Sequence, residues 1–314
     1  MNSTSSINAV KHLFRSGKLI KPEFIKKAND IHRYLFEYIE VTQTTDVHEI
    51  KISPSGVSFL IGDEQIRLFA PPNESRVAPV EVMNFDHYES EETKVIDLLS
   101  CGAKQILDIG ANIGWHTIRF AKHNPNANIH AFEPMPVSYS YLSRNIAANN
   151  AGCQVTPYNY GLSDAGGRFE FFIAPASGTN ASLLNVAEAA DADRVIGLTL
   201  TLDQWCSNYS IKPDFIKCDV EGAELLVFRG GRETLMRDKP IVFAELLRKW
   251  SKPFGYHPNE MLRFFSGLGY LCFAVGVCGV RQITQVEDET IETNYAFVHE
   301  HAHLQSIEKL NAFR

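Results

Sequence analysis

Long apolar runs, long basic runs and paired cysteines are all absent from this chain of 314 residues. No stretch approaches the roughly 18 consecutive apolar residues that a membrane-spanning helix needs. The formal net charge is −7 and there is no long basic segment, which argues against a nucleic acid as the main partner. We therefore expect neither a transmembrane segment nor nucleic-acid binding.

The cysteines are scattered, and none belongs to a C-x-x-C pair. They are Cys101, Cys153, Cys206, Cys218, Cys272 and Cys278. This spacing predicts reduced thiols in a cytosolic protein and no metal cluster held by cysteines. The first 30 residues are polar and basic without the apolar centre of a signal peptide, so we expect no secretory signal and a cytoplasmic location.

Basic and apolar residues are mixed in the N-terminal region, the apolar ones being Val10, Leu13, Phe14, Leu19, Ile20, Phe24 and Ile25. The mixture favours a packing helix or a dimer arm, and a membrane-surface helix is the alternative. Residues 1–45 predict two or three helices, and the alternation in residues 47–70 predicts a small antiparallel sheet. We divide the chain into an extension, residues 1–80, that serves oligomerisation or caps a substrate, and a main domain, residues 81–314.

Residues 104–134 contain an apolar run ending at Asp108, a glycine loop, a helical pattern and a second apolar run ending at Glu133. This order predicts a strand, a turn, a helix and a strand, which form one βαβ unit. Glycines let the backbone approach a ligand, and the helix N-terminus offers free N–H groups. Glu133, at the tip of the second strand, is placed to bind a ribose diol.

The loop has Asn112 where a dinucleotide-binding loop has its middle glycine, which allows the backbone to approach a pyrophosphate. S-adenosylmethionine contains an adenosine but no phosphate, and Asp108 suits its ammonium group. The loop therefore favours a methyl donor over NAD. A purely structural turn is the other interpretation.

Strands and helices alternate from residue 104 to about residue 300, which predicts a doubly wound α/β sheet. We expect residues 161–173 to include a fourth strand at the sheet edge, residues 176–194 to form a mobile loop, and residues 270–275 and 294–300 to pair as the last strands. Ligands bind outside the C-terminal ends of such strands. The polar residues expected there are Asp108, Glu133, Ser163, Asp164, Asp219, Glu221 and Glu245.

The pair Ser163 and Asp164, and a second cluster earlier in the chain, each have an alternative interpretation. Ser163 and Asp164 are placed to bond an adenine amino group, but Asp164 also begins a good turn sequence. A cluster before the first strand, Phe85, His87, Tyr88 and Glu89, forms either a wall of the cofactor pocket or a helix cap with an aromatic contact.

Six segments together resemble the FkbM family of S-adenosylmethionine-dependent methyltransferases over roughly residues 85–300. They are LDIGANIGWHT (107–117), AFEP (131–134), GLSD (161–164), TLDQW (201–205), FIKCDVEGAELLVFRGG (215–231) and IVFAEL (241–246). Gln204 and Cys218 depart from the family pattern. The resemblance implies a Rossmann-like class I methyltransferase sheet with an antiparallel final strand.

The resemblance also implies O-methylation of a hydroxyl on a sugar, a glycan or a secondary metabolite. By motif, Asp108, Gly110, Asn112 and Gly114 would hold the methionine part of the donor, Glu133 its ribose, and Ser163 with Asp164 its adenine. Tyr88, Trp115, Thr117, Pro134 and Asp219 complete the expected donor pocket. An acceptor on a protein or on nitrogen, and a non-catalytic nucleotide-binding module, are the alternatives.

An alcohol must lose its proton as the methyl group arrives. Asp219, Glu221 and Glu245 are the candidate bases, with His116 and His87 behind them. The same carboxylates would also suit a divalent metal that lowers the pKa of the hydroxyl. For Glu221 the alternative is a helix N-terminal acid that stabilises the dipole, and Glu224 is expected to be structural.

Three residues after the last buried strand, Arg248, Lys249 and Trp250, are candidates for gripping an anionic or sugar acceptor. The alternative for this segment is a solvated surface turn.

Overall fold

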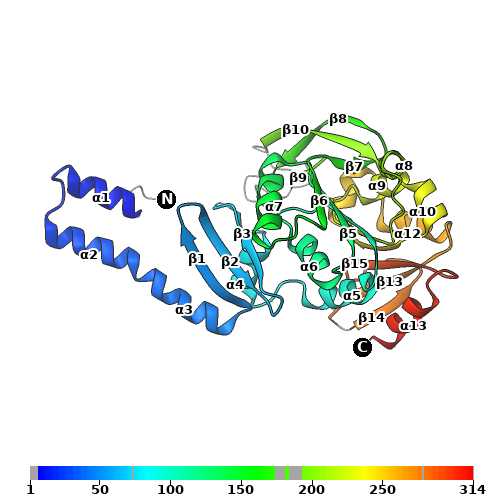
Figure 1. The fold of residues 1–314 in the computed structure, drawn as a ribbon, viewed down its shortest axis with the longest axis horizontal. Coiled ribbons are helices and arrows are strands. Elements are labelled where there is room, and N and C mark those ends of the chain that lie inside the picture. The colour runs from blue at the N-terminus through cyan, green and yellow to red at the C-terminus, as the bar shows by residue number, and fades with distance from the viewer. Residues whose placement is uncertain (1–5, 73, 174–180, 184–192, 278, 314) are drawn as a thin grey trace.

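A computed structural model describes residues 6–72, 74–173, 181–183, 193–277 and 279–313. An N-terminal helical arm projects from a small sheet, and that sheet lies beside an α/β body (Figure 1). The arm consists of α1 (Ile7–Arg15), α2 (Lys21–His32) and α3 (Tyr34–Thr44). The small sheet consists of β1 (Val47–Ser53), β2 (Gly56–Ile61) and β3 (Ile66–Phe69), antiparallel in chain order. The predicted helices and small antiparallel sheet are thus confirmed.

The central sheet has the strand order β14-β13-β15-β12-β11-β4-β5-β6. Its strands are β4 (Gln105–Ile109), β5 (Asn128–Phe132), β6 (Val155–Tyr158), β11 (Phe215–Cys218), β12 (Ile241–Glu245), β13 (Tyr270–Gly276), β14 (Gly279–Ile283) and β15 (Asn294–His299). Neighbours from β12 to β6 pair in parallel, whereas β15 is antiparallel to both β12 and β13. The predicted doubly wound sheet with an antiparallel final strand is confirmed.

Helices cover both faces of the central sheet (Figure 1). The helices after the small sheet are α4 (Ala78–Phe85), which packs on that sheet, and α5 (Ser90–Ser100), α6 (Trp115–His123), α7 (Pro136–Ala148), α8 (Leu202–Tyr209), α9 (Glu224–Arg229), α10 (Arg232–Asp238), α11 (Arg248–Ser251), α12 (Pro258–Ser266) and α13 (Leu304–Ala312), with a short 3-10 turn, η1 (Lys252–Phe254). Helix α4 and strand β14 are additions to the elements expected from the sequence. None of the helices in the described residues is long and apolar enough to cross a membrane.

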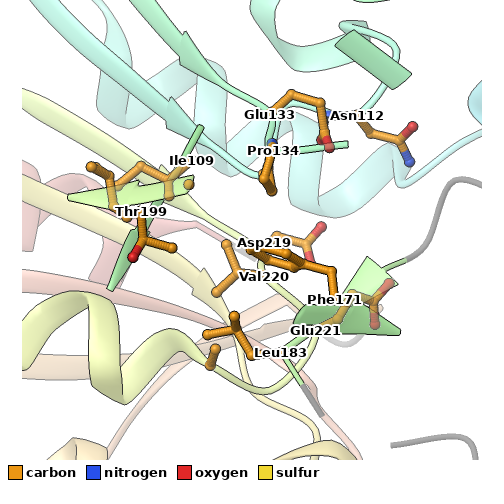
Figure 2. Close-up of a pocket in the computed structure, with 14 residues that line it drawn as sticks. Ile109, Asn112, Glu133, Pro134, Phe171, Leu183, Thr199, Asp219, Val220 and Glu221 are labelled. Atoms are coloured by element: carbon orange, nitrogen blue, oxygen red, sulfur yellow. Dashed lines mark hydrogen bonds between the residues drawn. The ribbon is translucent and has the colours of Figure 1, made fainter. Parts of the chain in front are cut away.

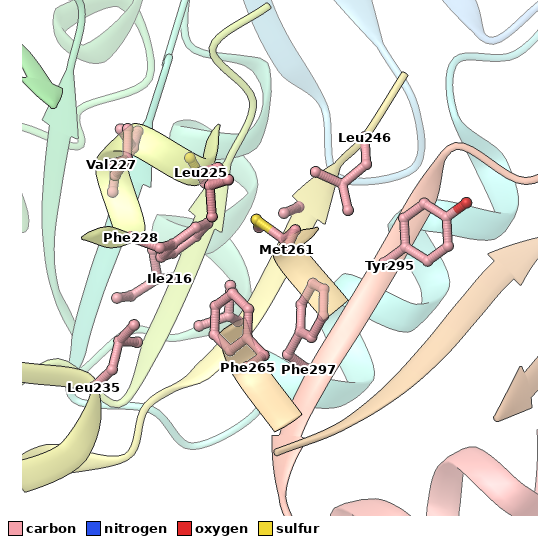
Figure 3. Close-up of a cluster of buried hydrophobic side chains, with 14 of the residues drawn as sticks. Ile216, Leu225, Val227, Phe228, Leu235, Leu246, Met261, Phe265, Tyr295 and Phe297 are labelled. Atoms are coloured by element: carbon pink, nitrogen blue, oxygen red, sulfur yellow. The ribbon is translucent and has the colours of Figure 1, made fainter. Parts of the chain in front are cut away.

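Alternate residues of each strand enter two separate hydrophobic clusters, as the two-residue period of a strand requires. Leu107 and Ile109 join a cluster with α9, α10 and α12, while Ile106 joins the cluster on the opposite face. Figure 3 shows the first cluster, in which Phe228, Phe265 and Phe297 pack together. With apolar packing on both faces, the edge formed by the strand C-termini is left for polar chemistry.

The expected sheet-edge strand in residues 161–173 is wrong. This segment forms β7 (Gly161–Ser163) and β8 (Gly167–Ile173), which pair with β10 (Asp193–Thr201) in a separate four-stranded sheet that also includes β9 (Ala181–Ser182). The edge strand β6 contains Pro157, and proline has no N–H to donate to another strand. Most of the loop expected at 176–194 lies outside the described residues.

The small sheet shares a hydrophobic cluster with α4 and α6, which includes Ile61, Leu68, Val82, Trp115 and Ile118. It is also bonded to α7, because the side chain of Asn145 accepts from the Phe69 N–H at 2.7 Å and donates to the Phe69 carbonyl at 3.1 Å. Within the N-terminal extension, the sheet is therefore integrated into the body, whereas α1 and α2 project from it. The division of the chain at residue 80 stays a prediction.

Candidate active site

The glycine loop after β4 packs against the loop after β11. Gly110 has φ +80°, and a Cβ at this position would lie 1.8 Å from the carbonyl oxygen of Asp219. No other residue fits this contact without moving one of the two loops, so Gly110 brings the loops after β4 and β11 together. Gly114, with φ +97°, lies under α7, where a Cβ would meet Leu142 at 2.8 Å.

A pocket of about 670 Å³, including the part open to solvent, lies over these loops. It is lined by Ile109, Gly110, Asn112, Glu133, Pro134, Gly161, Leu162, Phe171, Leu183, Thr199, Asp219, Val220, Glu221 and Ala223. Figure 2 shows Glu133 and Asn112 on one side and Phe171 and Glu221 on the other, with Asp219 between them.

Glu133 is 5% exposed and lines this pocket at the end of β5. One carboxyl oxygen accepts from the Asn112 N–H at 2.9 Å, and the other accepts from the Met135 N–H at 2.8 Å. Burial raises the pKa of Glu133 to about 7, although both backbone bonds act in the opposite direction. Each oxygen retains a lone pair, so the carboxylate can accept ligand hydroxyls as well.

Lys217 and Asp219 form a partly buried ion pair at the pocket, and Asp108 lies beside Lys217 on the neighbouring strand. Asp108 is fully buried and pairs in register with Lys217. Its Oδ2 accepts from Thr117 Oγ1 at 2.5 Å, while its Oδ1 has no partner in the described structure. Lys217 Nζ donates to Asp219 Oδ2 at 3.1 Å. Burial lowers the pKa of Lys217, but the charges of Asp219, Asp108 and Glu89 outweigh this and leave it above its usual value.

Lys217 was missed from the sequence, although a signal was present. It is the single charged residue of the buried strand β11, and the two-residue period puts it on the same face as Asp219. A lysine is almost never fully buried unless it is paired. The lone lysine therefore pointed to an acid partner at the strand end.

The pKa values of two further carboxyls close to Asp219 are raised. Burial, and then the charges of Asp219, Glu221 and Glu89, raise the pKa of Glu245 to about 10. Burial and the charges of Asp219 and Glu224 raise the pKa of Glu221 well above its usual value. Near neutral pH Glu245 therefore carries a proton and can donate a hydrogen bond.

Glu89 and His116 close the face of the site towards α5 and α6. Glu89 Oε2 lies 2.9 Å from His116 Nε2. Burial opposes ionisation of Glu89, but His116 and Lys217 hold its pKa below the usual value. Burial and the charges of Glu89, Asp219 and Glu245 raise the pKa of Tyr88 well above normal, which places the Tyr88 hydroxyl among these acids.

Glu224 ties the loop after β11 to the body. Its Oε1 accepts from the Val220 and Gly222 N–H groups at 3.0 and 3.1 Å, and its Oε2 accepts from the Tyr256 hydroxyl at 3.2 Å. These contacts fit the structural role expected of Glu224.

The structure brings six of the predicted site residues to the pocket: Gly110, Asn112, Glu133, Pro134, Asp219 and Glu221. The others are placed around it. Thr117 bonds to Asp108, and Trp115 packs in the cluster under the small sheet. Ser163 is buried on β7 and donates to Asp164 Oδ1 at 3.3 Å, next to the pocket residue Leu162. For these residues, cofactor contact stays a prediction.

Two further candidates have other contacts. Arg248 donates to the backbone carbonyls of Glu287, Asp288 and Thr290, so its guanidinium fastens a loop instead of facing an acceptor. The exposed His87 pairs with Asp46 at 2.8 Å. Among the described residues, no group of three or more His, Cys, Asp or Glu side chains has the geometry to hold a metal ion.

Phe171, Leu183 and Thr199 line the pocket from the separate four-stranded sheet and the segment next to it, and were not expected from the sequence. Placing β8 at the edge of the central sheet put it away from the site. Hence one wall of the pocket was missing from the sequence-based account.

Several known methyltransferases are similar to this chain. Methyltransferase sdnD of Sordaria araneosa is 34% identical over 153 residues, which cover 40% of this chain and 59% of that protein. 2-O-methyltransferase NoeI of Sinorhizobium fredii is 30% identical over 47% of this chain and 65% of its own length. Hexuronic acid methyltransferase AglP of Haloferax volcanii is 31% identical over 44% of this chain and 56% of its own length. The aligned part thus spans about three fifths of these relatives.

Among solved structures, a methyltransferase FkbM from Methylobacillus flagellatus aligns with a TM-score of 0.40 and 13% identity, covering 86% of this chain and 60% of that chain. The methyltransferase FkbM domain family matches residues 108–272, which is more than half of the sequence and contains the glycine loop, Glu133, Asp219 and Glu245. The chain belongs to the FkbM methyltransferase family.

Proposed function

We propose that this chain is an S-adenosylmethionine-dependent O-methyltransferase that acts on a hydroxyl of a sugar or a secondary metabolite. The observation that carries the proposal is the junction at Gly110, because it brings Glu133 and Asp219 to one pocket. One side of this pocket suits an adenosine, and the other side presents acids to an alcohol.

The residues present fit the donor. Its sulfonium and ammonium groups are positive, and carboxyls line or adjoin the pocket at Asp108, Glu133, Asp219 and Glu221. Buried acceptor atoms without a partner, Asp108 Oδ1 and Asn112 Oδ1, lie beside the glycine loop. We assign Glu133 to the ribose hydroxyls, and the loop from Asp108 to Gly114 to the methionine part. When bound, the donor supplies an electrophilic methyl group.

Asp219 is the base that we propose for the acceptor hydroxyl. The Lys217 ammonium donates a hydrogen bond to its carboxyl group at 3.1 Å, and the Asp219 side chain is 31% exposed, so a ligand can reach it. Glu245 carries a proton near neutral pH and is therefore a poor base, while burial and the charges of Asp219 and Glu224 raise the pKa of Glu221. Glu245 is suited to donate a hydrogen bond to a neighbouring acceptor oxygen, a pattern that polyhydroxy compounds match.

The relatives support the acceptor class. Two of them are named for a 2-O-methyl transfer and for a hexuronic acid, respectively. A protein or nitrogen acceptor is the alternative class. A cytoplasmic location belongs to the same proposal, since the five described cysteines are free thiols.

The test is a screen of methyl transfer from labelled donor to sugar nucleotides, glycans, polyketide alcohols and peptides, read by mass spectrometry. We expect an O-methylated product from an alcohol in the panel and its loss in Asp219→Asn. Methylation of peptides or amines alone would contradict the proposed acceptor class. Absence of any product, together with no donor binding, would contradict the enzyme assignment.

A further inference from the structure

The N-terminal arm is poorly buried for a helical segment. In residues 6–44 only Val10 and Ala28 are buried, and α3 has no buried residue at all. Nevertheless, eight of the large hydrophobic side chains that are exposed in the described structure belong to the arm: Phe14, Ile20, Ile25, Tyr34, Leu35, Phe36, Tyr38 and Ile39. Exposed apolar surface of this extent marks an interaction site.

The apolar side chains of α3 border a groove. Leu35, Tyr38, Ile39 and Thr42 lie at helical spacing on one face, opposite Ile50, Ile52, Val57 and Phe59 of β1 and β2 and Met83 of α4. The groove is mostly apolar and open to solvent, and no residue of α1 or α2 lines it. In Figure 1, α1 and α2 extend away from the body. A helix of about 10 Å diameter with an apolar stripe is the natural occupant of such a groove.

Charge differs sharply between the two halves of the arm. Residues 7–32, containing α1 and α2, carry six Lys and Arg against two acids, for a net charge of +4. Helix α3 carries Glu37 and Glu40 and no Lys or Arg. Each arm therefore contains a basic apolar helix pair and an acidic apolar helix, which complement each other when a second arm lies alongside.

We propose that the arm docks on a second copy of this chain, with α1–α2 of one protomer against α3 and its groove in the other. A two-fold axis repeats this contact, so both basic pairs and both grooves are covered at once. A membrane surface would attract α1–α2 but would leave the acidic α3 and its groove uncovered. The whole arm, residues 6–44, has a net charge of +3, which leaves a net charge of −10 on the rest of the chain. Anionic lipid would therefore repel the rest of the chain.

Charge exchange on the full-length chain tests this proposal. Lys21, Lys26, Lys27, Glu37 and Glu40 are all exposed, so changing them leaves the core intact. The first variant, Lys21→Glu with Lys26→Glu and Lys27→Glu, lowers the net charge of residues 7–32 from +4 to −2, so its arm has two acidic surfaces. The second, Glu37→Lys with Glu40→Lys, has two basic ones. Each variant alone brings like charges together in its own dimer, whereas a mixture pairs opposite charges at both contacts.

Sedimentation velocity should show a dimer for the native chain, with dissociation constants raised at least about tenfold in each variant. An equal mixture of the two should form a heterodimer. Leu35→Glu with Ile39→Glu should dissociate the dimer as well, while the control Ile291→Glu, on a 79% exposed residue of the body, should not. Circular dichroism and melting curves check that each variant is folded.

A native chain that remains monomeric across a broad concentration range would overturn the proposal. So would a dimer that both charge variants leave unchanged, or a mixture that forms no heterodimer. Binding of the monomer to vesicles of anionic phospholipid, abolished by Lys21→Glu with Lys26→Glu and Lys27→Glu, would assign the arm to a membrane surface instead.

Discussion

Two carboxyl groups, Glu133 in the pocket and Glu245 beside it, differ because of their neighbours. Glu133 accepts two backbone N–H bonds, and its pKa is about 7. Glu245 lies close to Asp219, Glu221 and Glu89, and its pKa is about 10. Both carboxyls lie at the end of a parallel strand of the same sheet. Glu133 is therefore poised to ionise around a ligand, whereas Glu245 stays protonated.

Asp219 differs from Glu221 and Glu245 because its side chain accepts a hydrogen bond from the Lys217 ammonium. Asp219→Asn removes the proposed base, and turnover should fall by about 10²- to 10⁴-fold, the usual contribution of a general base. Donor affinity should change far less. The measurement is single-turnover methyl transfer at saturating donor.

The matched control is Glu245→Gln. A protonated carboxyl and an amide are both neutral hydrogen-bond donors, so this variant should keep turnover within about tenfold of the native chain. An equal loss in Asp219→Asn and Glu245→Gln would mean that the two carboxyls share the role of base.

Gly110→Ala tests the junction that holds the two sides together. The added Cβ would clash with the Asp219 carbonyl, and φ +80° is unfavourable for alanine. We expect loss of donor affinity by more than about tenfold and destabilisation of about 2 kcal/mol or more, within the range for strained backbone positions. Calorimetric titration with adenosylhomocysteine and thermal melts measure the two effects. Gly152→Ala, where a Cβ meets nothing within 4 Å, is the control.

Retention of native donor affinity and melting temperature in Gly110→Ala would show that the loops do not need this close contact.

Glu133 should make the stability of the ligand-free protein depend on pH. Below about pH 4.5 the carboxyl is protonated in the folded and the unfolded chain alike. Between about 4.5 and 7 the unfolded chain loses the proton while the folded chain keeps it, so this contribution to stability falls as pH rises and is level above about 7. The total is on the order of 3 kcal/mol or less. In Glu133→Gln this contribution is absent.

Thermal melts of the native and Glu133→Gln chains at pH 5, 6, 7 and 8 check the sign, because most of the interval between the two pKa values lies within this range. The difference in melting temperature should move in favour of the variant as pH rises. Parallel curves for the two chains would contradict the assignment of a raised pKa to Glu133.

The sequence was sufficient to predict the features set by local rules. Gly110, the apolar runs and the acids at the strand ends follow from strand periodicity and the needs of a glycine turn, and the structure places them at one edge. The features that were missed depend on partners far along the chain. Arg248 bonds carbonyls about 40 residues later, and Lys217 meets Asp108 only through the sheet register.

The wall formed by Phe171 was missed for a similar reason. Its strand pattern is visible in the sequence, but the identity of the sheet it joins is not. Pro157 was the available signal, since a proline in a strand argues for an edge that accepts no further neighbour on its N–H side.

Calorimetric titration of the full-length chain with adenosylhomocysteine tests the central claim most directly, with Glu133→Gln beside the native protein. We predict one binding site per chain, and an affinity that falls at least about tenfold in the variant, as loss of a charged hydrogen-bond acceptor requires. Native affinity should also weaken as pH drops below about 7, because the carboxyl of Glu133 then carries a proton. A folded native chain that shows no binding, or a Glu133→Gln variant that binds as tightly as the native chain, would contradict the account.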